Sequence, residues 1–459
     1  MGCAGNTEVS TPNIDAIAAE GAMFRNAYSN CPVCVPVRGT LLTGLHPLRH
    51  GAAGNDLPIR TDLRSVADEL NDAGYDTAYI GKWHLGGVPR DQFITEDRRL
   101  GFRYWRANNC NHDYMNYFYD DNDNKRHYVR GYEPIVQTEL ALDYLRSRTK
   151  KDKPWAMYLC YSTPHNPYLR MPEEMQEHAK MRKVTLRDNV TRFSENDFEI
   201  PPEHHAYNTP RPNWKLGYPD EEALKLNIAG YYEHIEAMDA QIGRVLEHLK
   251  ETGEYDNTIV IYLSDHGDML GSHGMVDKQI YYEESAHVPF IVKWSGHVAP
   301  GPRSQLIGIE DISPTLLGMI GLKFAGDIDG HDLSRCLFDA DANGHEYLYF
   351  HNIVPAHNAW FRSNGMWRAV TDGRYVYAAD ENGEPMALYD LINDPYQMND
   401  IKSADKGNRL RLAGVLAEFV NRHDGFKPWQ RLLVEHGLGD LWDESQLHFG
   451  FPAIDPKYK

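Results

Sequence analysis

The stretch that decides the fold reads Ile259-Val260-Ile261-Tyr262-Leu263-Ser264-Asp265-His266-Gly267. Its first half is a continuous apolar run that predicts a buried strand, and polar or small residues follow at once. The segment before it predicts an amphipathic helix, because apolar residues recur there at spacings of three and four and Gly253 then ends the pattern. The repeating residues are Ile235, Met238, Ile242, Val245 and Leu249. A helix, an apolar strand and then polar residues is the order typical of a parallel sheet covered by helices.

The same order occurs twice earlier in the chain. A predicted helix over residues 66–73 precedes a strand over residues 77–80, which leads into Gly81-Lys82-Trp83-His84. A second predicted helix over residues 140–145 precedes a strand over residues 155–161, which leads into Thr163-Pro164-His165-Asn166-Pro167. Ligands of parallel sheets bind beyond the carboxyl ends of the strands. The polar side chains at these ends are Lys82, His84, His165, Asp265 and His266, and we expect them to meet at one edge of the sheet.

The pattern of predicted helices and strands changes near residue 345. Short strands are predicted over residues 367–370, 374–377 and 386–389, joined by turns, and a helix is predicted over residues 409–422. The sequence therefore predicts an α/β domain over residues 1–345, with a mostly parallel central sheet and helices on both faces. Residues 346–459 are predicted to form a small C-terminal α+β subdomain with an antiparallel sheet.

Charge and hydropathy exclude some partners. The net charge is −19, from 47 basic and 66 acidic residues, which disfavours nucleic acid and anionic membranes. No apolar run approaches the ~20 residues that span a bilayer. The start, Met1-Gly2-Cys3-Ala4-Gly5-Asn6, lacks the basic and apolar segments of a signal peptide, so none is expected on this chain.

Cys31-Pro32-Val33-Cys34 is the one close pair among six scattered cysteines. A C-x-x-C pair suggests a redox centre or half of a zinc site, and the alternative is two partly buried thiols. No second C-x-x-C completes a four-cysteine zinc site, and the surrounding sequence does not offer a thioredoxin-like context.

The residues from Cys34 to Gly44 read CVPVRGTLLTG and resemble the C-x-P-S-R-x-x-x-L-T-G signature of the type I sulfatases, with Val37 in place of the usual serine or alanine. Other segments resemble the same family in the same order along nearly the whole chain. They are Thr11-Pro12-Asn13-Ile14-Asp15, Gly81-Lys82-Trp83-His84-Leu85-Gly86, Pro164-His165-Asn166-Pro167, Ser264-Asp265-His266-Gly267, Lys278 with Tyr282-Glu283-Glu284-Ser285, and Leu388-Tyr389-Asp390-Leu391. The resemblance implies an alkaline-phosphatase-like fold.

The resemblance also implies a mechanism. Cys34 would be oxidised by a formylglycine-generating enzyme, and the formylglycine hydrate would attack the sulfur of a sulfate ester. The alcohol would leave with a proton from His165 or Lys278, and His84 would help to expel sulfate from the hemiacetal. Arg38 and Lys82 would hold the sulfuryl group. These roles suit the chemistry, because a sulfate ester is anionic and its hydrolysis needs positive charge around the sulfuryl oxygens.

Asp265, His266 and the modified Cys34 are the metal ligands that the resemblance implies, for Ca²⁺ or, as the other candidate, Mg²⁺. The family also has an apolar strand that ends in an Asp-Asp pair before the position of Cys3, and this sequence does not show that pair. A divalent ion held by so few side chains is expected to bind weakly. A signal peptide upstream of Met1 would place the protein in the periplasm or outside the cell, and otherwise it would be cytoplasmic.

Substrate specificity is expected in loops over residues 108–119 and 199–218, whose His, Tyr, Trp and Asn side chains suit sugar hydroxyls and ring faces. The predicted substrate is a sulfated carbohydrate. The alternatives are a phosphonate or phosphate monoester hydrolase of the same fold, and a catalytically inactive homologue that binds sulfated glycans. His46, His50, His112 and His273 are interpreted as structural, although His112 and Asp113 could lie in a substrate loop.

Overall fold

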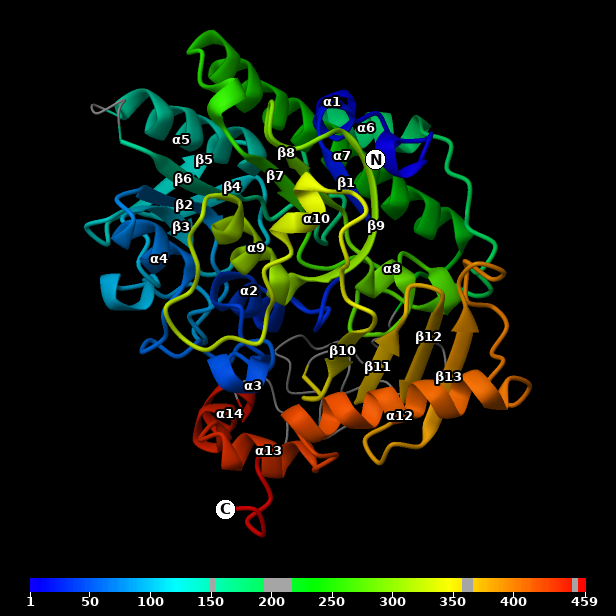
Figure 1. Ribbon diagram of the computed structural model, residues 1–459. Coiled ribbons are helices and arrows are strands. Elements are labelled where there is room, and N and C mark those ends of the chain that lie inside the picture. The colour runs from blue at the N-terminus through cyan, green and yellow to red at the C-terminus, as the bar shows by residue number, and fades with distance from the viewer. Residues whose placement is uncertain (149–152, 194–216, 357–365, 448–452) are drawn as a thin grey trace.

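The apolar stretch that decides the fold forms strand β7 (Val260–Leu263), and the helix predicted before it is α7 (Glu221–Glu251). The computed structural model describes residues 1–148, 153–193, 217–356, 366–447 and 453–459. Within these residues, helices cover two neighbouring sheets, and a smaller sheet lies apart from them near the C-terminal end (Figure 1). No helix of this described part is long and apolar enough to cross a membrane.

The strands of the α/β part form one sheet in the order β5-β4-β3-β2-β6 and another in the order β7-β8-β1-β9. Their bounds are β1 (Ala22–Tyr28), β2 (Asp76–Lys82), β3 (Tyr104–Asn108), β4 (Asn116–Asp120), β5 (Arg126–Arg130), β6 (Trp155–Cys160), β8 (Phe290–Lys293) and β9 (Gly301–Gly308). β2 runs parallel to β3 and β6, and β1 runs parallel to β9. The pairs β1–β8, β7–β8, β3–β4 and β4–β5 are antiparallel.

The predicted α/β class is confirmed, while the strand directions are more mixed than the sequence suggested. Parallel neighbours need a long crossover connection, and β2 and β6 have one that includes helix α5 (Glu133–Ser147). β4 and β5 are joined by residues 121–125 alone, so they can pair only as a hairpin.

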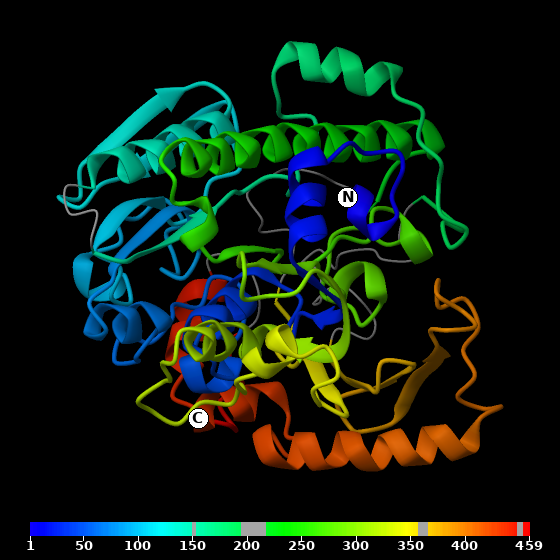
Figure 2. The ribbon, with the colours of Figure 1, turned by 45° about the horizontal axis from the view of Figure 1, so that its top comes forward.

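Helices lie on both faces of strand β2, because successive side chains of a strand point to opposite faces. Ala78 and Ile80 pack with residues of α5 and α7, whereas Tyr79 packs in the cluster that includes Leu70 and Leu317. The remaining helices are α1 (Pro12–Glu20), α2 (Cys34–Thr43), α3 (Pro47–His50), α4 (Val66–Asp72), α6 (Glu173–Met181), α8 (Glu283–Ala286), α9 (Ile312–Met319), α10 (Ser334–Phe338), α12 (Lys406–His423), α13 (Trp429–Glu435) and α14 (Gly439–Leu447). Figure 2 shows α7 as a long helix that crosses the α/β part.

A groove separates the two sheets of the α/β part. β6 is the terminal strand of one sheet, and β7 is the terminal strand of the other. Each has one edge that faces the other sheet, and no described strand pairs with either of these edges. All residues of both strands are only partly buried, whereas every residue of β8 is buried. Both strands line a groove of about 980 Å³, which reaches Arg38, Lys82 and Asp265 at one end. The single central sheet predicted from the sequence is therefore divided in the described residues.

The small antiparallel sheet predicted near the C-terminus is confirmed, in the order β10-β11-β12-β13. Its strands are β10 (Leu348–Asn352), β11 (Trp367–Thr371), β12 (Tyr375–Ala379) and β13 (Pro385–Asp390). Helix α12 packs on this sheet through Leu412, Leu416 and Val420, and Figure 1 shows it beneath the strands. The division of the chain at residue 345 stays a prediction.

Ser65 begins helix α4, which leads into β2 and so toward Lys82. Its hydroxyl accepts hydrogen bonds from the N–H groups of Ala67 and Asp68, and the Asp68 carboxylate accepts one from the Ser65 N–H in return. Ser65→Ala removes half of this capping box and also the buried hydrogen bond from the hydroxyl to the Leu100 carbonyl at 2.7 Å, so it is expected to lower the free energy of unfolding by about 1–2 kcal/mol. Urea denaturation would measure the loss. The exposed Ser10, changed to alanine, is the control, and equal effects of the two substitutions would contradict the capping role.

Candidate active site

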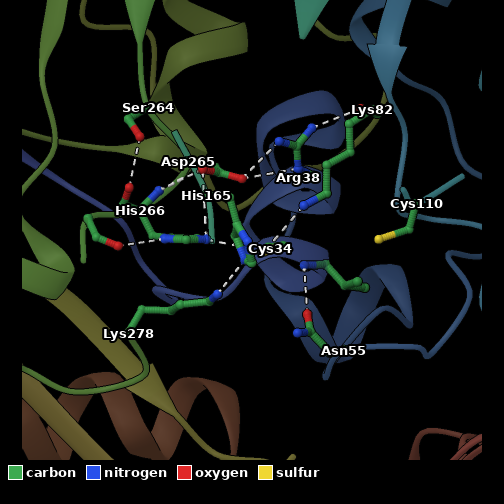
Figure 3. Close-up of polar contacts among 12 residues, drawn as sticks. Cys34, Arg38, Asn55, Lys82, Cys110, His165, Ser264, Asp265, His266 and Lys278 are labelled. Atoms are coloured by element: carbon green, nitrogen blue, oxygen red, sulfur yellow. Dashed lines mark hydrogen bonds and ion pairs between the residues drawn. The ribbon is translucent and has the colours of Figure 1, made fainter. Parts of the chain in front are cut away.

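Cys34 is the first residue of helix α2, and its side chain lies at the centre of the residues drawn in Figure 3. Val33 before it is extended, and the Val35 N–H donates to the Asn55 side chain at 3.1 Å. The backbone N–H groups and dipole of a helix N-terminus favour an anion there. Cys34 is 1% exposed, so little water competes with the protein for its side chain.

Cationic and imidazole side chains surround the Cys34 sulfur. His266 Nε2 lies 3.2 Å from it and Lys82 Nζ lies 3.8 Å from it. Burial by itself would raise the pKa of the Cys34 thiol, but Lys82, Lys278 and His266 outweigh burial and bring this pKa well below its ordinary value. The site therefore stabilises negative charge at position 34.

Lys278 and His165 form a pair beside Cys34. Lys278 Nζ lies 2.7 Å from His165 Nε2, and His165 Nδ1 lies 2.8 Å from the Asn166 carbonyl oxygen. Nδ1 therefore carries the proton that the carbonyl accepts, and Nε2 accepts a proton of the Lys278 ammonium. Burial and the nearby Lys278 charge lower the pKa of His165 to about 3, so the imidazole is neutral.

Arg38 lies one helical turn after Cys34, and its guanidinium binds Asp265. Its Nε and Nη2 donate to Asp265 Oδ2 at 3.1 and 3.0 Å, and its Nη1 donates to the Lys82 carbonyl at 2.9 Å. Burial raises the pKa of Asp265, but His266 and Arg38 bring it to about 2. Asp265 is therefore ionised, and Arg38 joins α2 to the ends of β2 and β7.

Cys34, Asp265 and His266 could hold a metal ion, because their ligand atoms all lie within 4.8 Å of one another. His266 Nδ1 donates to the Gly267 carbonyl at 2.7 Å, so a metal ion would bind Nε2 after that nitrogen has lost its proton. Ca²⁺, however, takes six to eight oxygen ligands. One carboxylate, already bound by Arg38, does not supply that shell, so the described residues alone do not fit calcium.

His84 and two residues that the sequence analysis did not select as catalytic complete the site. His84 is buried and has a left-handed backbone (φ 60°), so the chain turns shortly after the end of β2. Burial lowers the pKa of His84, but Cys110 and Cys34 raise it more. Cys110 Sγ lies 3.8 Å from His112 Nε2, and the His112 ring stacks on His165 at 4.6 Å. The interpretation of His112 as structural therefore missed its contact with the site.

One signal could have found Cys110 and His112. β3 runs parallel to β2 and pairs Asn108 with Lys82, so the residues after Asn108 leave the sheet at the same edge as Lys82. The rule about strand ends applies here too, but the residues of β3 were not identified as a strand.

The other selected histidines and loops lie as follows. His46 caps α3, and His50 contacts Thr40 and the Pro36 carbonyl, both structural roles. His273 stacks on Tyr282. In the first predicted loop, Arg170 binds the Asp113 carboxylate through two nitrogens at 2.7 and 3.0 Å. The second predicted loop lies outside the described residues except for Gly217 and Tyr218.

Glu133 is a buried acid at the start of α5, near Lys82 and Ser162. Burial raises its pKa from 4.5 to about 7. Between these two values the unfolded chain loses the proton while the folded protein keeps it, so the free energy of unfolding falls as the pH rises from 4.5 to 7 and the full penalty remains above pH 7. Glu133→Gln removes the ionisable group and is expected to raise the free energy of unfolding at pH 8 by about 1–3 kcal/mol, with little gain at pH 5. Urea denaturation at both pH values tests this, and an equal gain at both would contradict it.

Comparisons with known proteins agree with this geometry. The sulfatase family model matches residues 1–322, and a model described as the C-terminal region of N-sulphoglucosamine sulphohydrolase matches residues 271–418. An ulvan-active sulfatase of Formosa agariphila is 34% identical over 411 residues, which cover 87% of this chain and 74% of that protein.

Solved structures are similar over nearly the whole chain. The structure of the sulfatase YidJ of Bacteroides fragilis has a TM-score of 0.78 at 26% identity and covers 94% of each chain. A structure in complex with its substrate D-glucosamine-2-N,6-O-disulfate has a TM-score of 0.76 at 25% identity and covers 94% of this chain and 96% of its own. The family implies a divalent metal and a formylglycine residue. The order of the motifs, the family match and these structures together show that the chain belongs to the sulfatase family and is a sulfuric ester hydrolase.

Proposed function

We propose that this sulfatase hydrolyses a sulfate ester of a carbohydrate and that formylglycine made from Cys34 supplies the nucleophilic oxygen. The observation that carries the proposal is the placement of Cys34 at a helix N-terminus among Lys82, Lys278 and His266. The cysteine sulfur stands where the formylglycine oxygens would be, and the charges that stabilise a thiolate also suit an anionic oxygen. A formylglycine-generating enzyme is the partner that this chemistry needs.

The cations divide the work of binding and protonation. Lys82 binds the sulfuryl oxygens, because its side chain is buried and its ammonium faces Cys34. Arg38 orients Asp265 and adds positive charge beside the sulfuryl oxygens. Lys278 gives a proton to the departing alcohol, directly or through His165 Nε2, with which it shares a hydrogen bond. His84, which is buried and interacts with Cys34 and Cys110, takes the proton whose removal releases sulfate.

The metal is proposed to be Ca²⁺, with Asp265 and His266 among its ligands and Mg²⁺ as the other candidate. Since these residues do not complete a calcium shell, no step above depends on the ion. Metal analysis of the purified protein tests this assignment. Asp265→Asn is expected to lower the amount of bound Ca²⁺, and an unchanged Ca²⁺ content in this variant would contradict it.

Turnover of three substrate types tests the proposed reaction. Protein from a host that makes formylglycine is expected to release sulfate from a 6-O- or N-sulfated glucosamine faster, in kcat/KM, than from 4-nitrophenyl sulfate. It is expected to act poorly on phenylphosphonate esters. Preference for the phosphonate would favour the phosphonate monoester hydrolase alternative. Binding of the sulfated sugar without turnover, by fully modified protein, would favour the inactive glycan-binding alternative.

A further inference from the structure

Asp311, His331 and His345 form a cluster that the reaction does not use. Their ligand atoms lie within 4.8 Å of one another. Asp311 ends a short 3-10 helix after β9, His331 precedes α10, and His345 precedes β10. His345 also forms a β-bridge with Leu306 of β9, so the cluster lies where the α/β part meets the C-terminal sheet, which β10 begins. A cavity of about 450 Å³ beside it shares no lining residue with the groove that reaches the active site.

Asp311 is a carboxylate already fixed in place. Its side chain is fully buried, and its two oxygens accept hydrogen bonds from the N–H groups of Gly308 and His331, both at 2.8 Å. Gly330 makes this approach possible, because a Cβ there would overlap the Glu310 carbonyl oxygen. Each carboxylate oxygen keeps a second lone pair for another partner.

The two imidazoles approach Asp311 from the more open side. His345 Nε2 lies 3.0 Å from Asp311 Oδ2, and His331 Nδ1 lies 3.9 Å from Oδ1. The rings cross at 84° with centroids 5.1 Å apart. In a tetrahedral zinc site the ligand atoms lie ~3.3 Å from one another. The ligand atoms of this cluster therefore need to move only slightly to bind zinc. His331 can make it, because its side chain is 64% exposed and is free to turn.

Two imidazoles and one carboxylate are donors for a transition metal, as opposed to Ca²⁺ or Mg²⁺. The adjoining cavity leaves room for a water molecule as a further ligand, and Glu310 and Glu346 also line it. Binding would displace the proton that lies between His345 and Asp311, which would leave to solvent.

We propose that Asp311, His331 and His345 bind Zn²⁺ as a second metal site, distinct from the active site, that ties the start of the C-terminal sheet to the α/β part. An ion that binds the folded state and not the unfolded chain raises the melting temperature. The site stabilises the protein and takes no part in sulfate ester hydrolysis.

Metal titration of the full chain tests the site. A Cys34→Ala background removes one of the three possible metal ligands of the active site, and comparison with the His331→Ala variant in that background separates the two sites. Bound Co²⁺ is expected to show the visible absorption bands of a site with nitrogen and oxygen ligands. The sulfur-to-cobalt charge-transfer bands of a cysteine-bound ion should not appear. Zn²⁺ is expected to displace the Co²⁺ and to raise the melting temperature. Adding His331→Ala should weaken Zn²⁺ binding at least about tenfold and remove the thermal shift.

His297→Ala is the matched control, since His297 is also an exposed histidine but lies outside the cluster. His345→Gln should weaken binding as His331→Ala does, and circular dichroism of both variants without metal would show that they fold. Unchanged affinity in His331→Ala would overturn the proposal. So would an equal loss in His297→Ala, or no Zn²⁺ binding at a tenfold molar excess of metal.

Discussion

Cys34→Ala is expected to abolish sulfate ester hydrolysis, with a fall in kcat of about 10⁶-fold, the size of loss measured when another hydrolase loses its nucleophile. The alanine cannot be oxidised to formylglycine and offers no oxygen to the sulfur. Binding should persist, because Lys82 and Lys278 remain. Hydrolysis of a sulfated sugar would give the rate, and peptide mass spectrometry of the unsubstituted protein should show formylglycine at position 34.

Cys31→Ala is the matched control for this prediction. Cys31 is also buried, lies three residues earlier, and has a pKa that burial raises, in contrast to the lowered pKa of Cys34. Its loss should leave both the modification and the rate in place. Full activity from protein that retains an unmodified Cys34 thiol would refute the proposed nucleophile.

Lys82→Met is expected to lower kcat/KM by roughly 10²–10³, the loss that follows removal of one preorganised electrostatic partner. Methionine keeps most of the volume of the buried side chain and removes its charge. Because the lysine stabilises negative charge at position 34, the same substitution should raise the pKa of the thiol in unmodified protein. Steady-state kinetics and thiolate absorbance measure the two effects.

Lys293→Met separates the loss of a catalytic charge from the loss of any buried lysine. Lys293 on β8 is as buried as Lys82, but its ammonium donates to the Tyr255 carbonyl and lies over the Tyr255 ring. Its substitution should lower stability and leave kcat/KM nearly unchanged. Equal kinetic losses in the two variants would assign Lys82 to folding.

The sequence predicted those parts of the fold that have one dominant pattern. β6 and β7 are apolar runs after amphipathic or apolar helices, and the polar residues after them follow from the order of the chain. β3 to β5 were missed because residues 104–130 are rich in Tyr, Arg and Asn, and β4 and β5 are half-exposed strands without an apolar run. That omission also removed the strand-end argument that would have linked Cys110 and His112 to Lys82.

Contacts between residues far apart in the chain could not be predicted from the sequence for a different reason. Arg38 and Asp265 are 227 positions apart, and their ion pair depends on how α2 lies against the end of β7. The resemblance implied that Arg38 holds the sulfuryl group, and this role stays a prediction; the structure adds that its guanidinium binds Asp265. Only the packing of the two elements determines which anion the guanidinium meets.

The facing edges of β6 and β7 affect how this protein behaves in concentrated solution. An unpaired edge presents backbone N–H and C=O groups that can pair with a strand of another molecule. Such pairing depends little on side-chain identity, so residues 1–459 are expected to self-associate as their concentration rises. Light scattering across a dilution series would detect this, and an extended peptide that fills the groove should suppress it. The groove between the two sheets, which leads to Asp265, is therefore also expected to affect the solubility of the protein.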